Sequence, residues 1–360
     1  MSKAKKKLGI GIIGSGGIAQ NAHMPGYAKL PEKCKIIAIS DINADSAKEA
    51  AEKFNVKHVF SDYQEMLKMD EIDAISVCTP NFLHMQPTID ALKAGKDVLC
   101  EKPLARTGEE ARKMVQVAKD TKRLLQVGLH YRFTSTAKFI HKYVSEGRMG
   151  DIYFARAQAL RRRGIPGWGV FIDKDKQGGG PLIDIGVHIL DYTLYCMGYP
   201  KAVSASGMTY QKFGKRGDVV GLMGQWDYKK FTVEDFAVGM IRFDNGATVI
   251  LESSFCANIS KDVFATELMG TKSGVYSVPG DPSQLKIATE DNMQLYNMEP
   301  CGLGESNQYS DEIAAFVDSI LEGKPSQVPG EQGFMLNAIF DAIYKSTETG
   351  REELIDLTIK

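Results

Sequence analysis

The chain has 360 residues, enough for two domains, and its 44 basic and 45 acidic residues leave a net charge of −1. Because nucleic acids and anionic membranes attract basic surfaces, this balance argues against either as the main partner. No apolar run approaches the roughly 18 residues of a membrane span, and the run at 8–13 is too short for the core of a secretion signal. Lys3, Lys5, Lys6 and Lys7 are expected to form a solvated tail.

Six cysteines are scattered along the chain, and no two of them have the C-x-x-C spacing of zinc sites or redox pairs. Cys78 and Cys100 lie in apolar runs, which predicts that both are buried. We therefore expect no metal site, no disulfide framework and a location in the reducing cytoplasm.

The first third of the chain alternates two patterns. Apolar runs rich in β-branched residues predict strands at 8–13, 34–40, 74–78, 97–100 and 124–128. Helical stretches are predicted between them at 44–54, 62–68, 86–94 and 108–121. Because these strands are apolar throughout, we expect a parallel sheet covered on both faces, in an α/β domain over residues 1–128.

After residue 128 the pattern changes. Helices are predicted at 136–146, 185–197, 311–322 and 333–347. Strand-like runs cover 152–161 and then 202 to about 296, and Asn245-Gly246 between two such runs is a strong hairpin signal. Residues 129–360 are therefore expected to form an α+β domain with a mainly antiparallel sheet.

A glycine-rich turn follows the first predicted strand. The stretch Gly14-Ser15-Gly16-Gly17-Ile18-Ala19 has the pattern G-x-G-x-x-A, which lets backbone amides approach a pyrophosphate that faces a helix N-terminus. Asp41 closes the second strand, where a carboxylate can bind both hydroxyls of the adenosine ribose and would repel a 2′-phosphate. The pattern predicts a Rossmann domain that binds NAD rather than NADP. The alternative is a structural glycine turn, with Asp41 as a cap for the next helix.

Polar residues follow the strand predicted at 74–78. Thr79, Asn81 and His84 come after its carboxyl end, the edge at which parallel sheets bind their ligands. They are candidates for contacts with the cofactor. Ordinary turn and helix-cap chemistry explains the same residues equally well.

The triplet Glu101-Lys102-Pro103 closes the next strand in the same cleft. A salt bridge at a strand end is one interpretation of it. A lysine at this edge can also orient a substrate hydroxyl or move a proton. Glu101 and Lys102 are therefore further candidates for contacts with the cofactor.

A second glycine-rich stretch, residues 178–188, has the pattern G-G-G-x-x-x-D-x-G-x-H and contains Asp184 and His188. If the stretch is helical, these two side chains share one face. A histidine beside a carboxylate is a natural general base, and the carboxylate would raise its pKa. The alternative is a helix-capping aspartate and a core histidine.

Together the four motifs resemble the glucose–fructose oxidoreductase, inositol dehydrogenase and rhizopine catabolism (Gfo/Idh/MocA) family over nearly the whole chain. The resemblance implies a Rossmann domain followed by a large open sheet, and an enzyme that acts on a hydroxyl or ketone of a sugar or inositol. It implies that Lys102, Asp184 and His188 form the catalytic trio, and that the peptide bond before Pro103 is cis.

The resemblance also places a substrate-facing loop at 161–169. Trp168 can present an apolar face to a sugar or to the nicotinamide, and Arg163 can hold hydroxyls or a carboxylate. Tyr131 and Arg132, after the last Rossmann strand, are weaker candidates, and Asp184 and His188 also face the substrate. The alternative is a basic solvated loop with one packed tryptophan.

These observations predict an oxidoreductase that transfers a hydride between NAD and a carbinol carbon of a sugar, glycoside or cyclic polyol. A dehydrogenase of a non-sugar, such as a dihydrodiol, and a non-catalytic dinucleotide or sugar sensor are the alternatives. The free face of an open sheet predicts a homodimer or homotetramer.

Overall fold

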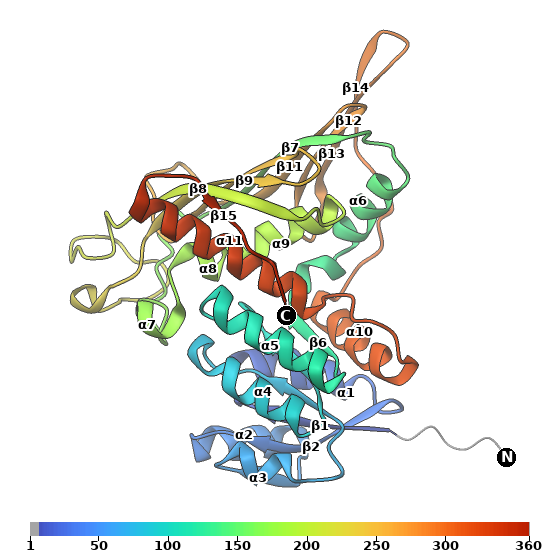
Figure 1. Cartoon of the computed structure of the whole chain (residues 1–360), viewed down its shortest axis with the longest axis vertical. Coiled ribbons are helices and arrows are strands. Elements are labelled where there is room, and N and C mark those ends of the chain that lie inside the picture. The colour runs from blue at the N-terminus through green and yellow to red at the C-terminus, as the bar shows by residue number, and fades with distance from the viewer. Residues whose placement is uncertain (1–6, 360) are drawn as a thin grey trace, which may run out of the picture.

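A computed structural model describes residues 7–359 and contains two sheets, with helices between and around them (Figure 1). The predicted tail residues Lys3, Lys5 and Lys6 lie outside the described residues, and Lys7 is exposed. Within residues 7–359, no helix is long and apolar enough to cross a membrane. The predicted fold class is confirmed: a parallel α/β sheet precedes a mixed, mainly antiparallel one.

The first sheet has six strands in the order β3-β2-β1-β4-β5-β6, and its neighbouring strands are all parallel. The strands are β1 (Leu8–Ile13), β2 (Cys34–Ser40), β3 (His58–Phe60), β4 (Ala74–Val77), β5 (Asp97–Glu101) and β6 (Leu125–Gly128). The central strands β1 and β4 are buried along their whole length because helices cover both faces. Strand β3 was not predicted, since its three half-exposed residues carry no apolar run.

Short helices follow the strands of this sheet. They are η1 (Ala19–His23), α1 (Met24–Ala28), α2 (Ala44–Phe54), α3 (Tyr63–Leu67), η2 (Asn81–Leu83), α4 (Met85–Lys93) and α5 (Gly108–Thr121). Side chains of Asn43, Asp62 and Thr107 accept hydrogen bonds from the first turns of α2, α3 and α5, which fixes where these helices begin. The interpretation of Asp41 as the cap of α2 is therefore wrong.

The second sheet has nine strands in the order β14-β13-β12-β11-β7-β10-β9-β8-β15. They are β7 (Ile152–Leu160), β8 (Ala202–Tyr210), β9 (Phe236–Phe243), β10 (Thr248–Ser254), β11 (Val263–Gly270), β12 (Ser273–Val278), β13 (Asp281–Asp291), β14 (Gln294–Met298) and β15 (Glu353–Leu354). Within the described residues of this second sheet, β7 and β10 are the only neighbours that pair in parallel. The predicted hairpin at Asn245-Gly246 is confirmed as the β9–β10 connection.

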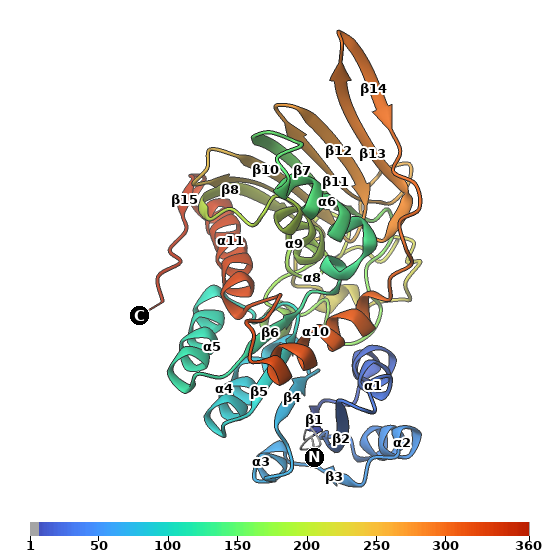
Figure 2. The ribbon, with the colours of Figure 1, turned by 90° about the vertical axis from the view of Figure 1, so that its right-hand side faces the viewer.

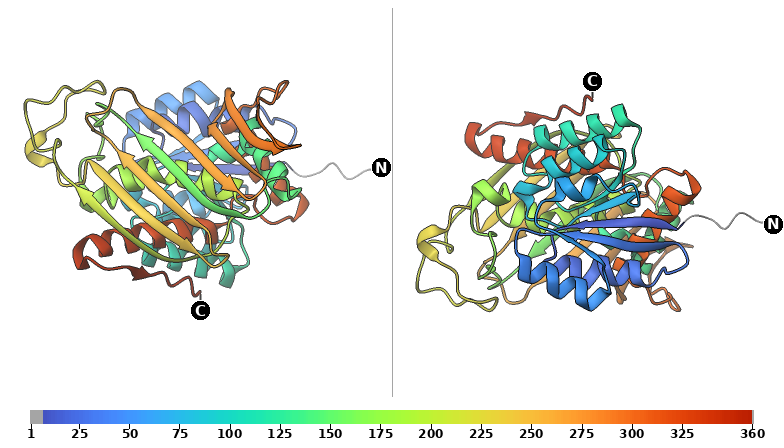
Figure 3. Two further views of the ribbon diagram at one scale, coloured as in Figure 1. Left: turned by 90° about the horizontal axis from the view of Figure 1, so that it is seen from above. Right: turned by 90° about the horizontal axis from the view of Figure 1, so that it is seen from below.

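Helices cover one face of this sheet and leave the other open. The covering helices are α6 (Ser135–Ser145), α8 (Pro181–Asp184), α9 (Gly186–Cys196) and α11 (Gly330–Thr349). Seen from above, the strands themselves form the outermost layer (Figure 3). The β13–β14 hairpin extends beyond the rest of the sheet (Figure 2).

The helices near the C-terminus return to the first sheet. Ile313, Phe316 and Val317 of α10 (Gln308–Glu322) are buried in one cluster with residues of β1, β2 and α1. Helix α11 lies between α5 and β8 and so contacts both domains. The assignment of 129–360 to a separate second domain stays a prediction.

Candidate active site

A cavity of about 670 Å³, here called the dinucleotide groove, runs along the carboxyl ends of β1, β2 and β4. Gly14, Gly16, Gly17, Ile18, Asp41 and Thr79 are among the predicted residues that line it. Gly14 has φ of 90°, and a Cβ there would lie 2.8 Å from the Cys78 carbonyl carbon, so only glycine fits. A Cβ on Gly16 would meet nothing within 4 Å. The open space at Gly16 therefore fits the pyrophosphate of a dinucleotide.

The Asp41 carboxylate is held at the edge of this groove. It accepts hydrogen bonds from the Ser15 amide at 2.6 Å, the Ser15 hydroxyl at 2.8 Å and the Asn43 amide at 2.8 Å. Ser15 is buried beneath the loop and does not line the groove. Its hydrogen bonds hold Asp41 against the glycine turn. We therefore replace the predicted contact between Ser15 and the cofactor with an indirect role, in which Ser15 orients Asp41.

Asn81 and His84 lie behind the groove rather than on it. The Asn81 amide donates to the Gln177 carbonyl at 3.0 Å. The two ring nitrogens of His84 each lie 2.8 Å from a carbonyl oxygen, one of Thr79 and one of Pro103, so the ring joins the ends of β4 and β5. The structure supports Thr79 as a contact for the cofactor and gives the other two residues a positioning role.

Glu101 is likewise turned away from the groove. Its carboxylate accepts a hydrogen bond from Nε2 of His23 at 2.8 Å, which ties the helix after the glycine turn to the end of β5. Burial favours a high pKa for Glu101, but the hydrogen bond and charge of His23 outweigh it and lower the pKa. Neither of the two cavities described in this section includes Glu101 in its lining, and Oε2 of Glu101 accepts a hydrogen bond from the Lys102 amide at 3.1 Å.

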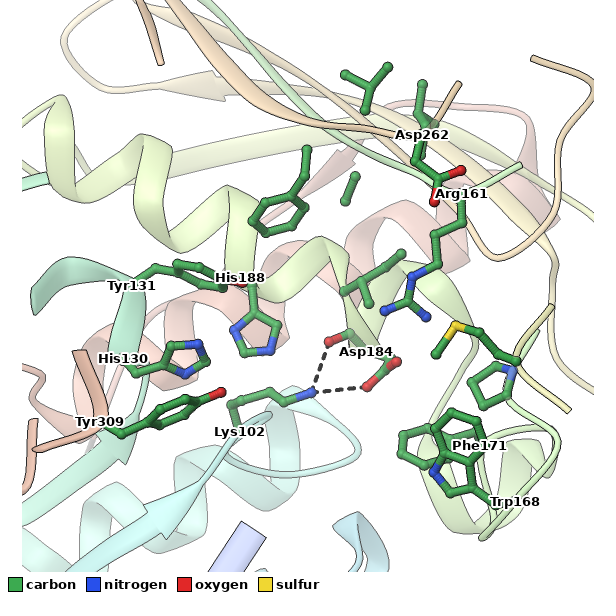
Figure 4. A pocket seen from close by; sticks show the side chains of 17 residues that line it. Lys102, His130, Tyr131, Arg161, Trp168, Phe171, Asp184, His188, Asp262 and Tyr309 are labelled. Atoms are coloured by element: carbon green, nitrogen blue, oxygen red, sulfur yellow. Dashed lines mark hydrogen bonds and ion pairs between the residues drawn. The ribbon is translucent and has the colours of Figure 1, made fainter. Parts of the chain in front are cut away.

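A second cavity, of about 480 Å³ and here called the central cavity, lies next to the end of β5 (Figure 4). Nζ of Lys102 donates to Oδ1 of Asp184 and to the Asp184 carbonyl oxygen, both at 2.9 Å. This pair is largely buried. The peptide bond between Lys102 and Pro103 is cis, as the family resemblance implies.

His188 faces the same cavity, but Asp184 is not its partner. The helix predicted at 185–197 is confirmed as α9, which begins at Gly186, but Asp184 belongs to the separate short helix α8 that ends before it. Asp184 therefore turns to Lys102, and Nδ1 of His188 is buried without a hydrogen-bond partner. The imidazole ring itself lines the central cavity, so a ligand there can contact it.

The electrostatic surroundings of His188 also differ from the prediction. Burial lowers its pKa well below 6.5, and the positive charges of Lys102 and Arg161 lower it further. The prediction that a neighbouring carboxylate raises the pKa of His188 is wrong, because the Asp184 carboxylate is paired with Lys102. His188 is therefore a neutral imidazole near pH 7.

Sequence reasoning missed four polar residues of the central cavity. They are His130, Arg161, Asp262 and Tyr309. The His130 ring lies 5.0 Å from the His188 ring and 4.3 Å from the Tyr309 ring, centroid to centroid. Burial lowers the pKa of His130 to about 4. No motif marks His130, Asp262 and Tyr309, whereas Arg161 is the first residue of the predicted loop at 161–169 but was not singled out there.

The other predicted substrate residues divide into two groups. Tyr131 and Trp168 line the central cavity. Arg163 does not, because its guanidinium donates to the Ala257 carbonyl at 2.9 Å and to the Asn258 side chain at 2.7 Å. Arg132 is buried in an ion pair with Asp191, so we withdraw both arginines as substrate residues.

The Arg132–Asp191 pair is expected to stabilise the fold instead. Arg132→Met should lower the free energy of unfolding by about 3–5 kcal/mol, because it leaves the 1% exposed Asp191 as an unpaired buried charge. Urea denaturation measures the loss. The matched control is Arg156→Met. The Arg156 side chain is about half exposed, so its loss should lower the free energy of unfolding by less than about 1 kcal/mol. Equal effects from the two variants would contradict the assignment.

Comparison with known proteins gives matches over most of the chain. Residues 8–129 match a family described as "Oxidoreductase family, NAD-binding Rossmann fold", and residues 138–276 match "GFO/IDH/MocA C-terminal domain". D-glucoside 3-dehydrogenase of Escherichia coli (strain K12) is 36% identical, over 95% of this chain and 96% of that protein. Levoglucosan dehydrogenase of Pseudarthrobacter phenanthrenivorans is 28% identical, over 98% of each. A structure of levoglucosan dehydrogenase with NADH and levoglucosan has a TM-score of 0.85 and 26% identity, and the match covers 97% of this chain and 100% of that one.

Proposed function

Because the chain belongs to the Gfo/Idh/MocA family of NAD-binding oxidoreductases, we propose that it oxidises a ring hydroxyl of a neutral sugar, with a glucoside as the first candidate. The same residues serve the reverse reduction. The proposal is supported above all by the convergence of Lys102, Asp184 and His188 on one cavity. The glucoside is favoured because the 36% identical relative is named as a glucoside dehydrogenase.

The order of the strands supports this assignment of roles. Lys102 directly follows β5, and β5 lies beside β4, whose end is next to the dinucleotide groove. When bound, NAD supplies the nicotinamide ring that accepts the hydride from the carbinol carbon. Lys102 donates a hydrogen bond to the reacting oxygen and is oriented by Asp184. His188 accepts the hydroxyl proton as the carbonyl forms, a role that suits a neutral imidazole lining the central cavity.

The test is a panel of methyl glucosides, levoglucosan, myo-inositol and an aromatic dihydrodiol, incubated with NAD and followed by NADH absorbance. We expect turnover of the glucosides. Turnover of the dihydrodiol alone would replace the substrate class. Tight binding of NADH with no turnover of any compound would favour a sensor, although a sensor has no need of three converging catalytic side chains.

A preference for NAD over NADP is proposed from Asp41. Its carboxylate lines the groove and would repel a 2′-phosphate, and Lys176, the basic side chain that also lines the groove, is already paired with Asp173 at 3.1 Å. Asp41→Ala should weaken NAD binding and reduce the difference in affinity between NAD and NADP. Titration of the tryptophan fluorescence with each cofactor measures both affinities. A wild-type protein that binds NADP⁺ more tightly would contradict the proposal.

We also propose a homodimer or homotetramer, assembled through the open face of the nine-stranded sheet and located in the cytoplasm. Large side chains are exposed on this sheet, among them Tyr153, Met208 and Tyr210. None of the six cysteines forms a disulfide, as a reducing compartment requires. Light scattering at micromolar concentration tests the assembly, and a monomer mass would contradict it.

A further inference from the structure

We propose that a third cavity, outside Trp168, binds the second sugar or other neutral aglycone of a glycoside whose reacting ring occupies the central cavity. The cavity measures about 300 Å³ and is here called the outer cavity. This inference rests on the proposed function, because it names the part of the substrate that lies beyond the reacting ring. Trp168 and Pro166 line both cavities, so one ligand can extend from the first into the second.

The walls of the outer cavity have the chemistry of a carbohydrate site. The chain has two tryptophans, and both Trp168 and Trp226 line this cavity. The Trp168 side chain is 54% exposed. Figure 4 shows it beside Phe171 at the edge of the central cavity, with their rings 6.2 Å apart. Trp226 uses its ring nitrogen to donate to the Gly214 carbonyl, so its apolar ring face is what remains for a ligand.

The charges around the two indoles balance. Lys176 lies 3.1 Å from Asp173, and Lys230 lies 3.3 Å from Asp227, counted between the amine nitrogen and a carboxylate oxygen. All four line the outer cavity and offer both donors and acceptors. Their net charge is zero, which suits the hydroxyls of a neutral sugar better than a phosphate or a carboxylate.

The two loops that carry the tryptophans are fastened to each other. The Gly167 amide donates to the Met223 carbonyl at 2.9 Å, and the Thr232 amide donates to the Ile172 carbonyl at 2.9 Å. A Cβ on Gly167 would lie 2.5 Å from the Gln225 carbonyl oxygen, so the backbones touch there. The cavity between the loops is therefore formed before a ligand arrives, which reduces the ordering cost of binding.

Kinetics with two substrate sizes tests the proposal. Trp226→Ala should lower kcat/KM for maltose or cellobiose on the order of tenfold, through the loss of ring stacking, and leave methyl glucoside within about twofold. Trp226→Phe keeps an aromatic face and should restore most of the disaccharide activity. Tyr228→Ala is the matched control, because Tyr228 is on the same loop and outside the cavity lining. Equal losses on both substrates with Trp226→Ala, or no loss, would overturn the proposal.

Fluorescence gives a second test that needs no turnover. In Trp168→Phe the only remaining tryptophan is Trp226. We expect a disaccharide to change its emission saturably without cofactor, and methyl glucoside to leave it unchanged. This result stands even if no sugar is oxidised, so failure of the outer cavity and failure of the proposed function can be told apart. Unchanged emission with every disaccharide would overturn the proposal.

Discussion

His188→Ala is expected to lower kcat by roughly 10²–10⁴-fold while NAD binds as before. The loss follows because, in the proposed mechanism, the imidazole that lines the central cavity is the base that takes the hydroxyl proton. His188 is not among the residues that line the dinucleotide groove, so the affinity for the cofactor should be unchanged. Stopped-flow turnover of a methyl glucoside and a separate NADH titration measure the two quantities.

The pH profile of the wild type gives an independent check on the same assignment. A base must be unprotonated to act, so oxidation falls when the pH drops through its pKa. Burial and the positive charges of Lys102 and Arg161 place that pKa below 6.5. The acidic limb of kcat/KM should therefore lie below pH 6.5, and His188→Ala should abolish it. His141→Ala is a suitable control, because this histidine lies outside the cavity with its Nδ1 bonded to the Tyr195 carbonyl. Near-normal turnover in His188→Ala with an unchanged limb would move the role of base to Lys102.

The sequence predicted the parts of the protein that depend on local pattern. The strands at 8–13 and 34–40 agree with the structure to the residue, because buried parallel strands are continuous apolar runs. The glycine turn, Asp41 and Thr79 line one groove as expected, because the topology of a parallel sheet brings every carboxyl end to one edge. The predicted burial of Cys78 and Cys100 is also confirmed, because both lie in apolar runs of the covered sheet.

The parts that failed depend on contacts between distant residues. The ion pair of Arg132 joins it to a residue 59 positions away, and no local pattern shows that its charge is already neutralised. Arg161 enters the cavity, and Arg163, two residues later, turns to the backbone after β10, because the chain leaves β7 at Leu160. A basic loop alone does not show which of its arginines faces inward.

The second large effect is expected at Lys102. Lys102→Ala should lower kcat by roughly 10²–10⁴-fold, because in the proposed mechanism the amine holds the reacting oxygen. Asp184→Ala should cost less, since the Asp184 backbone carbonyl still accepts from Nζ of Lys102 at 2.9 Å. The double variant should be no slower than Lys102→Ala, because the carboxylate acts through the amine and both serve one oxygen. Additive losses would show that Asp184 contacts the substrate independently.

The residual activity of Lys102→Ala carries a further consequence for His188. The positive charge of Lys102 is, after burial, the largest cause of the lowered pKa of His188. Its removal should therefore raise that pKa and move the acidic limb of kcat/KM to higher pH. Lys102→Arg keeps the charge and should leave the limb near its wild-type position even if its bulkier head group slows turnover. If the acidic limb of kcat/KM stays at the same pH in Lys102→Ala, the group that titrates is not His188. The proposed closeness of the Lys102 amine and the His188 imidazole would then be contradicted as well.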